Sequence, residues 1–333
     1  MALVLYTITL IPMLGMVALV VDMGVEFGRK AKMQSAVDAA VLAAAPNLGT
    51  TNTAKLTLAR TTAKNLAAAN GYALSDADIV ISTSPGSPVP NDTITINRAQ
   101  TDNLFFARAL GINTANVSVL AKAQVGAVTG RGGVVPFGLE KQLVPFISGA
   151  QYCLKLGATG PCGAIALTGN FQALNIDVGD SGATPYRADI VEGSDTPLKI
   201  GDIRDIAQGA VAGPTRQGVG CGAMPGGGPS RLTGNTQTFS QVLAGPDVDG
   251  KYDVLDWNSP RLILIPIITY PTPPPYQTVQ VDSFAGFFLE TCAGSGPYTS
   301  VTGIFVELNW VNAEWSALTA GNDNGQRTVR MVQ

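Results

Sequence analysis

The sequence predicts an α+β protein with a long N-terminal hydrophobic helix, a small β-β-α-β subdomain and a β-rich, disulfide-containing globular body. Three observations predict this order. Residues 1–21 carry no charge. After Tyr72 the apolar spacing changes from helical to alternating. Glycine (38) and proline (21) are frequent, as is typical of a turn-rich β body. We therefore expect three parts, residues 1–48, 49–130 and 131–333.

The composition excludes several classes of function. Of 333 residues 14% are charged, the net charge is −3 and there is no histidine. Globular domains carry about 25% charged residues, and nucleic-acid binders are usually basic. Without histidine there is no Ser-His-Asp or Cys-His catalysis and no histidine metal ligand. The glutamates of the body show no spacing that singles out a catalytic pair. We expect a protein that is not an enzyme, has no cofactor and binds no nucleic acid.

The uncharged run at residues 1–21 predicts a membrane helix. At 1.5 Å per residue it measures about 30 Å, the hydrocarbon thickness of a bilayer. A signal peptide would begin with a basic region and have a shorter apolar core. The basic residues Arg29, Lys30 and Lys32 follow the run and by themselves would place the body in the cytoplasm. The four cysteines favour the opposite side, so we expect a basic leader upstream that is clipped just before Met1.

The helix is expected to continue to Pro46. Its second half has a stripe of mostly small apolar residues at helical spacing, which permits close helix packing. The stripe consists of Met33, Ala36, Val37, Ala40, Val41 and Ala44. It could pack on the chain's own body or on copies of the chain, and the pattern does not separate these alternatives.

The next segments predict the small subdomain. A second helix is expected over Thr53–Asn70, with Gly71 as its C-terminal stop. Strands are expected over Asp78–Thr83, Asp92–Asn97 and Val117–Val128, with a short helix over Thr101–Leu110.

The body is expected to be built from strands and turns. Pro266 demotes its strand to a sheet edge or marks a bulge. Tyr270–Tyr276 is a proline-rich stretch that we interpret as a rigid connector. The predicted strands are Gly163–Leu167, Arg261–Ile268, Thr278–Thr291 and Val301–Trp310.

The four cysteines predict disulfides and an oxidising, extracytoplasmic location. Three connectivities are possible. In one of them Cys153 pairs with Cys162 across a short loop, and Cys221 then pairs with Cys292 across a long one. The competing four-cysteine zinc site needs closely spaced cysteine pairs, and the sequence has none.

One acidic loop is a weak calcium candidate. Asp247, Asp249 and Asp253 occupy positions 1, 3 and 7 of a possible calcium loop. Asn258 stands at position 12, where an EF-hand needs glutamate, so the pattern fails. Ordinary turns, in which aspartate bonds its own backbone, are the default expectation.

The N-terminal residues resemble TadG-like proteins of the TadE/TadG-like group, from tight-adherence (Flp) pilus assembly systems. The resemblance begins with Val20–Gly24 (VVDMG) and Arg29–Ala45 (RKAKMQSAVDAAVLAAA). Segments such as Asn103–Ile112 and Phe284–Glu290 extend it along the chain. The resemblance implies a bacterial surface protein that is anchored by its first helix, with its body outside the cytoplasmic membrane. Pilins typically carry Glu at the fifth mature position, whereas this sequence has Leu5.

These observations together predict a structural subunit of an extracellular, pilus-like filament. The expected partners are copies of the chain in a helical filament, membrane lipid before assembly, the pilus assembly machinery and a leader peptidase. The alternatives are a membrane-anchored accessory protein of the assembly system and a surface adhesin. The expected assembly face of the first helix follows three- and four-residue steps and comprises Leu3, Tyr6, Leu10, Met13, Val17, Val20 and Phe27.

Overall fold

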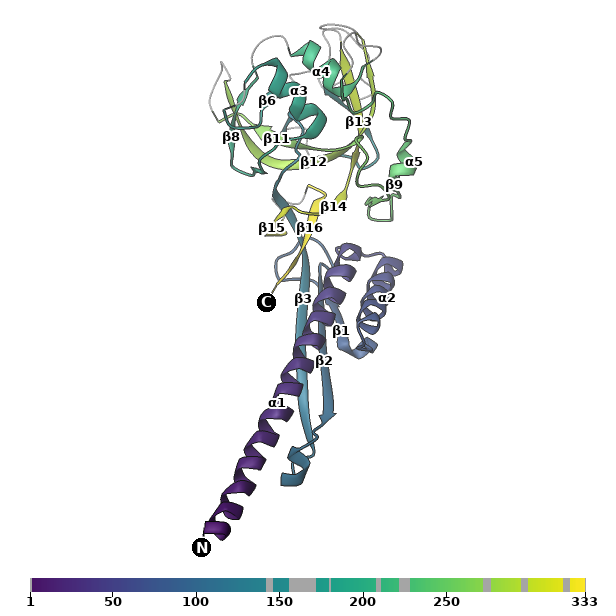
Figure 1. Ribbon diagram of the computed structural model, residues 1–333. Helices are drawn as coiled ribbons and strands as arrows, with labels where there is room; N and C mark the ends of the chain where they lie inside the picture. Colours follow the sequence, from purple (N-terminus) through teal and green to yellow (C-terminus); the bar gives the residue numbers. More distant parts are fainter. Residues whose placement is uncertain are drawn as a thin grey trace. The chain divides into compact units, whose positions relative to one another are not determined.

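The computed structural model confirms the α+β class, with a long N-terminal helix followed by a β-rich body (Figure 1). The contacts divide the chain into two units. The first comprises residues 1–85, 89–125 and 330–333, and the second residues 86–88 and 126–329. No side chain is described for residues 2–9, 11, 12, 14, 110 and 155. The structure describes residues 2–141, 146–155, 172–179, 181–207, 211–221, 228–271, 277–294, 299–319 and 324–332.

The first unit begins with the helix α1 (Ala2–Ala44), which ends in the 3-10 turn η1 (Ala45–Asn47). The next helix, α2 (Thr53–Ala69), starts where the Asn52 side chain accepts hydrogen bonds from the backbone N–H groups of Ala54 and Lys55. Such a cap satisfies donors that lack a partner inside the helix. Figure 1 shows α2 beside the C-terminal half of α1.

The alanine-rich stripe of α1 packs against its own unit. Its six members, Met33, Ala36, Val37, Ala40, Val41 and Ala44, are at most 2% exposed. The helix α1 contacts both α2 and the strand β2, and α2 contributes Ala59, Ala63 and Ala67 as fully buried residues. The structure thus supports the first of the two alternatives for this stripe.

A long antiparallel hairpin completes the first unit. The 3-10 turn η2 (Asp76–Asp78) leads into β1 (Ile79–Ser82), which pairs with β2 (Thr93–Asn103). The strand β2 pairs in turn with β3 (Thr114–Arg131), from Thr93 opposite Gln124 to Asn103 opposite Thr114. The helix predicted over Thr101–Leu110 is therefore wrong in its first half. Cross-strand contacts such as Thr101 Oγ1 to Asn116 Oδ1 (2.7 Å) extend the strand, and only the 3-10 turn η3 (Ala107–Leu110) is helical.

The second unit is rich in short strands. Its helices are α3 (Ala183–Glu192), α4 (Ala212–Val219) and α5 (Phe239–Val242). Its principal strands are β4 (Phe137–Glu140), β5 (Gln151–Lys155), β6 (Gln172–Asn175), β8 (Ile203–Ile206), β11 (Leu262–Thr269), β12 (Thr278–Ala293) and β13 (Ser300–Val306). Shorter strands are β7 (Leu198–Lys199), β9 (Leu243–Ala244), β10 (Asp253–Val254), β14 (Leu308–Trp310) and β15 (Glu314–Ala317). The last strand in the sequence, β16 (Gln326–Met331), pairs parallel with β14.

The central pairing of this unit closes into a ring. It runs β11-β4-β6-β8-β12, and β12 pairs again with β11, while β13 and β5 continue from β12. Because β11 lies inside the unit, its side chains are buried on both faces. Ile263 and Ile265 enter one core cluster with Phe287, and Leu264 enters a second with Phe284. A strand buried on both faces reads as a continuous apolar run, which explains the sequence RLILIPII.

The structure corrects the edge-strand prediction for Pro266. The strand β11 has neighbours on both sides, since β12 pairs antiparallel and β4 pairs parallel with it. Pro266 falls between the bridge of Leu264 to Val134 and the β4 pairing that starts at Ile267, so no N–H is needed there. The alternative expectation of a bulge is met at the next step, between Ile267 and Ile268. The predicted strand over 163–167 and most of the proline-rich stretch, residues 272–276, lie outside the described residues.

Candidate functional site

The candidate functional surface is an exposed apolar stretch of α1, from Leu10 to Phe27, which we call the exposed segment. Of the expected assembly face, Val17 is 60% and Phe27 is 72% exposed, and Leu10, Met13 and Val20 are exposed as well. The side chains of Leu3 and Tyr6 lie outside the described set. Apolar side chains are also exposed on the neighbouring faces, at Met16, Val21, Met23 and Val25. Leaving such side chains in water costs roughly 1.5–3 kcal/mol each relative to full burial.

Asp22 lies within this stretch, and it is buried at 5% exposure. One carboxylate oxygen, Oδ1, accepts hydrogen bonds from the backbone N–H groups of Phe105 (3.1 Å) and Phe106 (3.2 Å). The other, Oδ2, accepts from Phe106 (2.9 Å) and Ala107 (2.6 Å). Burial raises the pKa of Asp22, but the hydrogen bonds from Ala107, Phe106 and Phe105 outweigh it and bring the pKa below its ordinary value.

The segment that Asp22 holds is the turn between β2 and β3, residues 104–113, which we call the hairpin tip. The backbone N–H of Leu104 donates to the Asn113 carbonyl (3.0 Å) and closes the turn. Gly111 has a φ of 83°, a conformation that side chains other than glycine rarely adopt. Phe105 is 79% exposed, and Phe106 and Ile112 are exposed beside it. Sequence reasoning missed this feature; the signal was a Phe-Phe pair in a stretch with no acidic residue.

Polar contacts fix α1 beyond the exposed segment. The Arg29 guanidinium lies 2.7 Å from Glu26 and 3.8 Å from Asp102 on β2. The Tyr72 hydroxyl donates to the Arg29 carbonyl (3.3 Å). Arg29, Tyr72 and Asp102 line a hollow of about 430 Å³ together with Lys32. Because Arg29 pairs with both Glu26 and Asp102, we assign these contacts a role in holding the helix.

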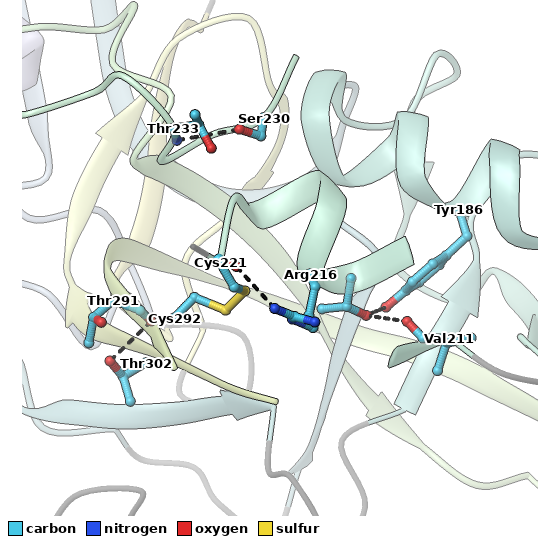
Figure 2. The surroundings of a disulfide bond; sticks show 10 residues. Tyr186, Val211, Arg216, Cys221, Ser230, Thr233, Thr291, Cys292 and Thr302 are labelled. Carbon is cyan, nitrogen blue, oxygen red and sulfur yellow. Dashed lines mark hydrogen bonds between the residues drawn. A yellow bond between two sulfur atoms is a disulfide. The ribbon is translucent and has the colours of Figure 1, made fainter. Parts of the chain in front are cut away.

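A disulfide between Cys221 and Cys292 is present in the second unit (Figure 2). It joins the end of α4 to β12 and spans 71 residues of sequence. The Arg216 side chain donates to the Cys221 carbonyl (3.4 Å), and Thr302 Oγ1 donates to the Thr291 carbonyl (3.4 Å) beside Cys292. The disulfide-containing body is thereby confirmed. The connectivity in which Cys221 pairs with Cys292 would leave Cys153 to Cys162, and Cys162 lies outside the described residues.

The acidic loop folds as turns. Asp247 Oδ1 accepts hydrogen bonds from the backbone N–H groups of Asp249 (3.0 Å) and Lys251 (2.9 Å), which is the local bonding that aspartate makes in turns. Asp253 is the first residue of the strand β10. Across the described residues no group of three Cys, Asp or Glu is placed to hold a metal ion.

The fold and the exposed segment define the class of protein: an N-terminal helix with an exposed apolar segment belongs to a small α+β unit, and a β-rich body follows it in the sequence. Residues 1–47 match the family model described as "Putative Flp pilus-assembly TadE/G-like". The resemblance stated for the N-terminal region is confirmed by this match, which covers α1 and η1. The match connects this segment with Flp pilus assembly and a cell-surface or membrane-associated location. No curated protein and no solved structure matches the chain.

The membrane prediction for the first helix stays a prediction. In the part of the chain that the structure describes, no helix combines the length and the apolar character needed to cross a bilayer.

Proposed function

We propose that this chain is a structural subunit of an extracellular, pilus-like filament and is not an enzyme. The observation that carries the proposal is the division of α1 into two parts. From Met33 onward the alanine-rich stripe is buried in the chain's own unit, although Leu42 on another face is exposed. Between Leu10 and Phe27, by contrast, most of the described large apolar side chains are exposed. The described side chains of the exposed segment are therefore free to pack on another surface, and the same segment of neighbouring copies would supply one of matching chemistry.

The match of residues 1–47 to a pilus-assembly family supports this assignment. Subunits that pack helix against helix in a repeating, non-closing arrangement generate a helical filament. The body would lie on the outside, where oxidising conditions favour the Cys221–Cys292 disulfide. Before assembly, the uncharged residues 1–21 would be held in the cytoplasmic membrane. A leader peptidase and the pilus assembly machinery would then process and extract the chain.

The first test is to shear cells, pellet the released material and examine it by electron microscopy with mass-spectrometric identification. The proposal expects filaments in which this chain is the dominant protein. If the chain stays in the membrane fraction while a shorter pilin forms the filaments, it is an anchored accessory factor and the proposal is wrong.

A substitution in the exposed segment tests the packing itself. We expect Val17→Asp to abolish filaments, because an unpaired carboxylate in an apolar helix bundle costs several kcal/mol per subunit. The matched control is Leu58→Asp, since Leu58 is 51% exposed and lies on α2 rather than α1. Filaments should persist in the control. Normal filaments from Val17→Asp would contradict packing through the exposed segment.

A further inference from the structure

We propose that the hairpin tip is a second membrane contact, which enters the interfacial layer of an anionic phospholipid surface while α1 is held in the membrane. The inference rests on the membrane stage of the proposed function and adds to it a partner for residues 104–113. Four observations on the first unit carry it.

The first observation is the position of the tip along α1. The amides of Phe105, Phe106 and Ala107 lie within 2.6–3.2 Å of the Asp22 carboxylate. Asp22 is the first charged residue after the uncharged run 1–21. If that run occupies the hydrocarbon layer, the contact with Asp22 places the tip at the level where hydrocarbon gives way to headgroups. Phenylalanine is among the side chains that amphipathic segments bury at this level of a membrane.

The second observation is the chemistry of the exposed side chains. Phe105, Phe106 and Ile112 are all exposed, although they are large and apolar. The two phenyl rings meet edge to face, with centroids 5.0 Å apart, and so form one apolar surface. An apolar surface of this kind gains free energy when it leaves water for the boundary between headgroups and acyl chains.

The third observation is that most backbone amides of the tip are already hydrogen-bonded. Asp22 takes the amides of residues 105–107, and Leu104 donates to Asn113. The amides of Ala109, Gly111 and Ile112 donate to carbonyls within the tip. A loop can enter a poorly hydrated layer only if its polar backbone groups have partners. The Asp22 contact therefore prepares the tip for such a layer.

The fourth observation is the charge around the tip. Arg108 is the one charged residue in the sequence of residues 104–113, and its side chain is exposed. Lys30 and Lys32 are also exposed and lie roughly 12–15 Å further along α1, at 1.5 Å per residue. The apolar side chains of the hairpin tip can enter the lipid, while the basic side chains near it attract anionic headgroups.

The test uses the full chain with Phe105→Trp, reconstituted in vesicles of phosphatidylcholine and phosphatidylglycerol. Some of the vesicles contain lipids brominated at the upper part of the acyl chain, which quench nearby tryptophan. The native residues Trp257, Trp310 and Trp315 all lie in the second unit, and the unsubstituted chain supplies their background. The matched control is Val80→Trp, because Val80 is an exposed apolar residue on β1, in the same unit but away from the tip.

We expect the added tryptophan at 105 to show blue-shifted emission and loss of fluorescence with brominated lipid, and the one at 80 to show neither. Arg108→Glu in the Phe105→Trp background should reduce the quenching in anionic vesicles but not in pure phosphatidylcholine. Hydrogen exchange of α2 reports that these variants remain folded.

Three outcomes would overturn the inference in different ways. If the chain floats with the vesicles and residue 105 is not quenched, the tip does not touch lipid, while the membrane stage stands. If the chain does not float, the membrane stage fails and this inference fails with it. If the emission of residue 105 shifts only in sheared filaments, the occupant of the tip is a second copy of the chain.

Discussion

At the scale of single residues, Asp22 has two roles: it ends the uncharged run of α1, and it binds the backbone of the hairpin tip. Its place after an uncharged run is visible in the sequence, but its partners lie 83–85 residues further along the chain. The carboxylate accepts hydrogen bonds from three consecutive amides and so ties the turn between β2 and β3 to α1. In this way a charge that is costly next to an apolar segment becomes a tertiary contact.

The lowered pKa of Asp22 gives a pH prediction. Because the folded-state pKa lies below the ordinary 3.8, the contact contributes its full stability above that value and loses it as the pH falls through the lower, folded-state pKa. In a pH titration followed by NMR, the amide signals of Phe106 and Ala107 should move together with a midpoint below 3.8. A midpoint at or above 3.8 would show that the hydrogen bonds do not favour the charged carboxylate.

Removal of the carboxylate should act locally. We expect Asp22→Ala to abolish hydrogen-exchange protection at the amides of 105–107 at neutral pH, because their acceptor is gone. Protection of α2 should stay as it is. Loss of protection throughout the first unit would mean that Asp22 supports the whole unit rather than the tip.

At the scale of elements, the packing contact between α1 and α2 depends on small side chains. Alanines at 36, 40 and 44 on α1 and at 59, 63 and 67 on α2 are buried to 2% exposure or less. Small residues let two helices approach closely, and a tightly packed contact has no room for extra methylene groups. The stripe on α1 was visible in the sequence because it keeps helical spacing.

We expect Ala63→Leu to destabilise the first unit by about 1–3 kcal/mol, the usual cost of overpacking. The matched change Ala68→Leu, at an exposed position of the same helix, should stay within about 0.5 kcal/mol of the unsubstituted chain. Denaturant unfolding followed by hydrogen exchange of α2 measures both. Equal effects of the two substitutions would contradict close packing between α1 and α2.

Prediction from sequence succeeded where a pattern is local. The second helix was expected over Thr53–Asn70 and runs over Thr53–Ala69, since its period lies within the segment and its cap and glycine stop lie directly beside it. The strand β12 was expected over Thr278–Thr291 and extends to Ala293. Prediction failed where residues distant in the sequence determine the local conformation. The Asp22 contact and the long β2–β3 pairing turned the expected helix at Thr101 into strand, and the neighbours of β11 removed Pro266 from the sheet edge.

At the scale of the whole molecule, the chain forms two units that are stabilised by different interactions. The first depends on α1, α2 and the hairpin, and its residues include no cysteine. The second contains the closed ring of strands, both apolar cores around β11 and β12, and all four cysteines. The ring could not be predicted, because pairing among short strands such as β4, β6 and β8 leaves little trace in a single sequence.

The disulfide provides the test of this division. In a chain-entropy model, closing 71 residues stabilises the folded state by about 4 kcal/mol, and measured losses fall at about 2–5 kcal/mol. We expect the double variant Cys221→Ser, Cys292→Ser to lower the melting temperature of the second unit and to leave that of the first unchanged. Calorimetry of the full chain measures this directly, with Ala63→Leu as the opposite control, which should lower only the transition of the first unit. A single transition that shifts as a whole in both variants would show that the two units unfold together, and the division drawn from the contacts would then have no thermodynamic counterpart.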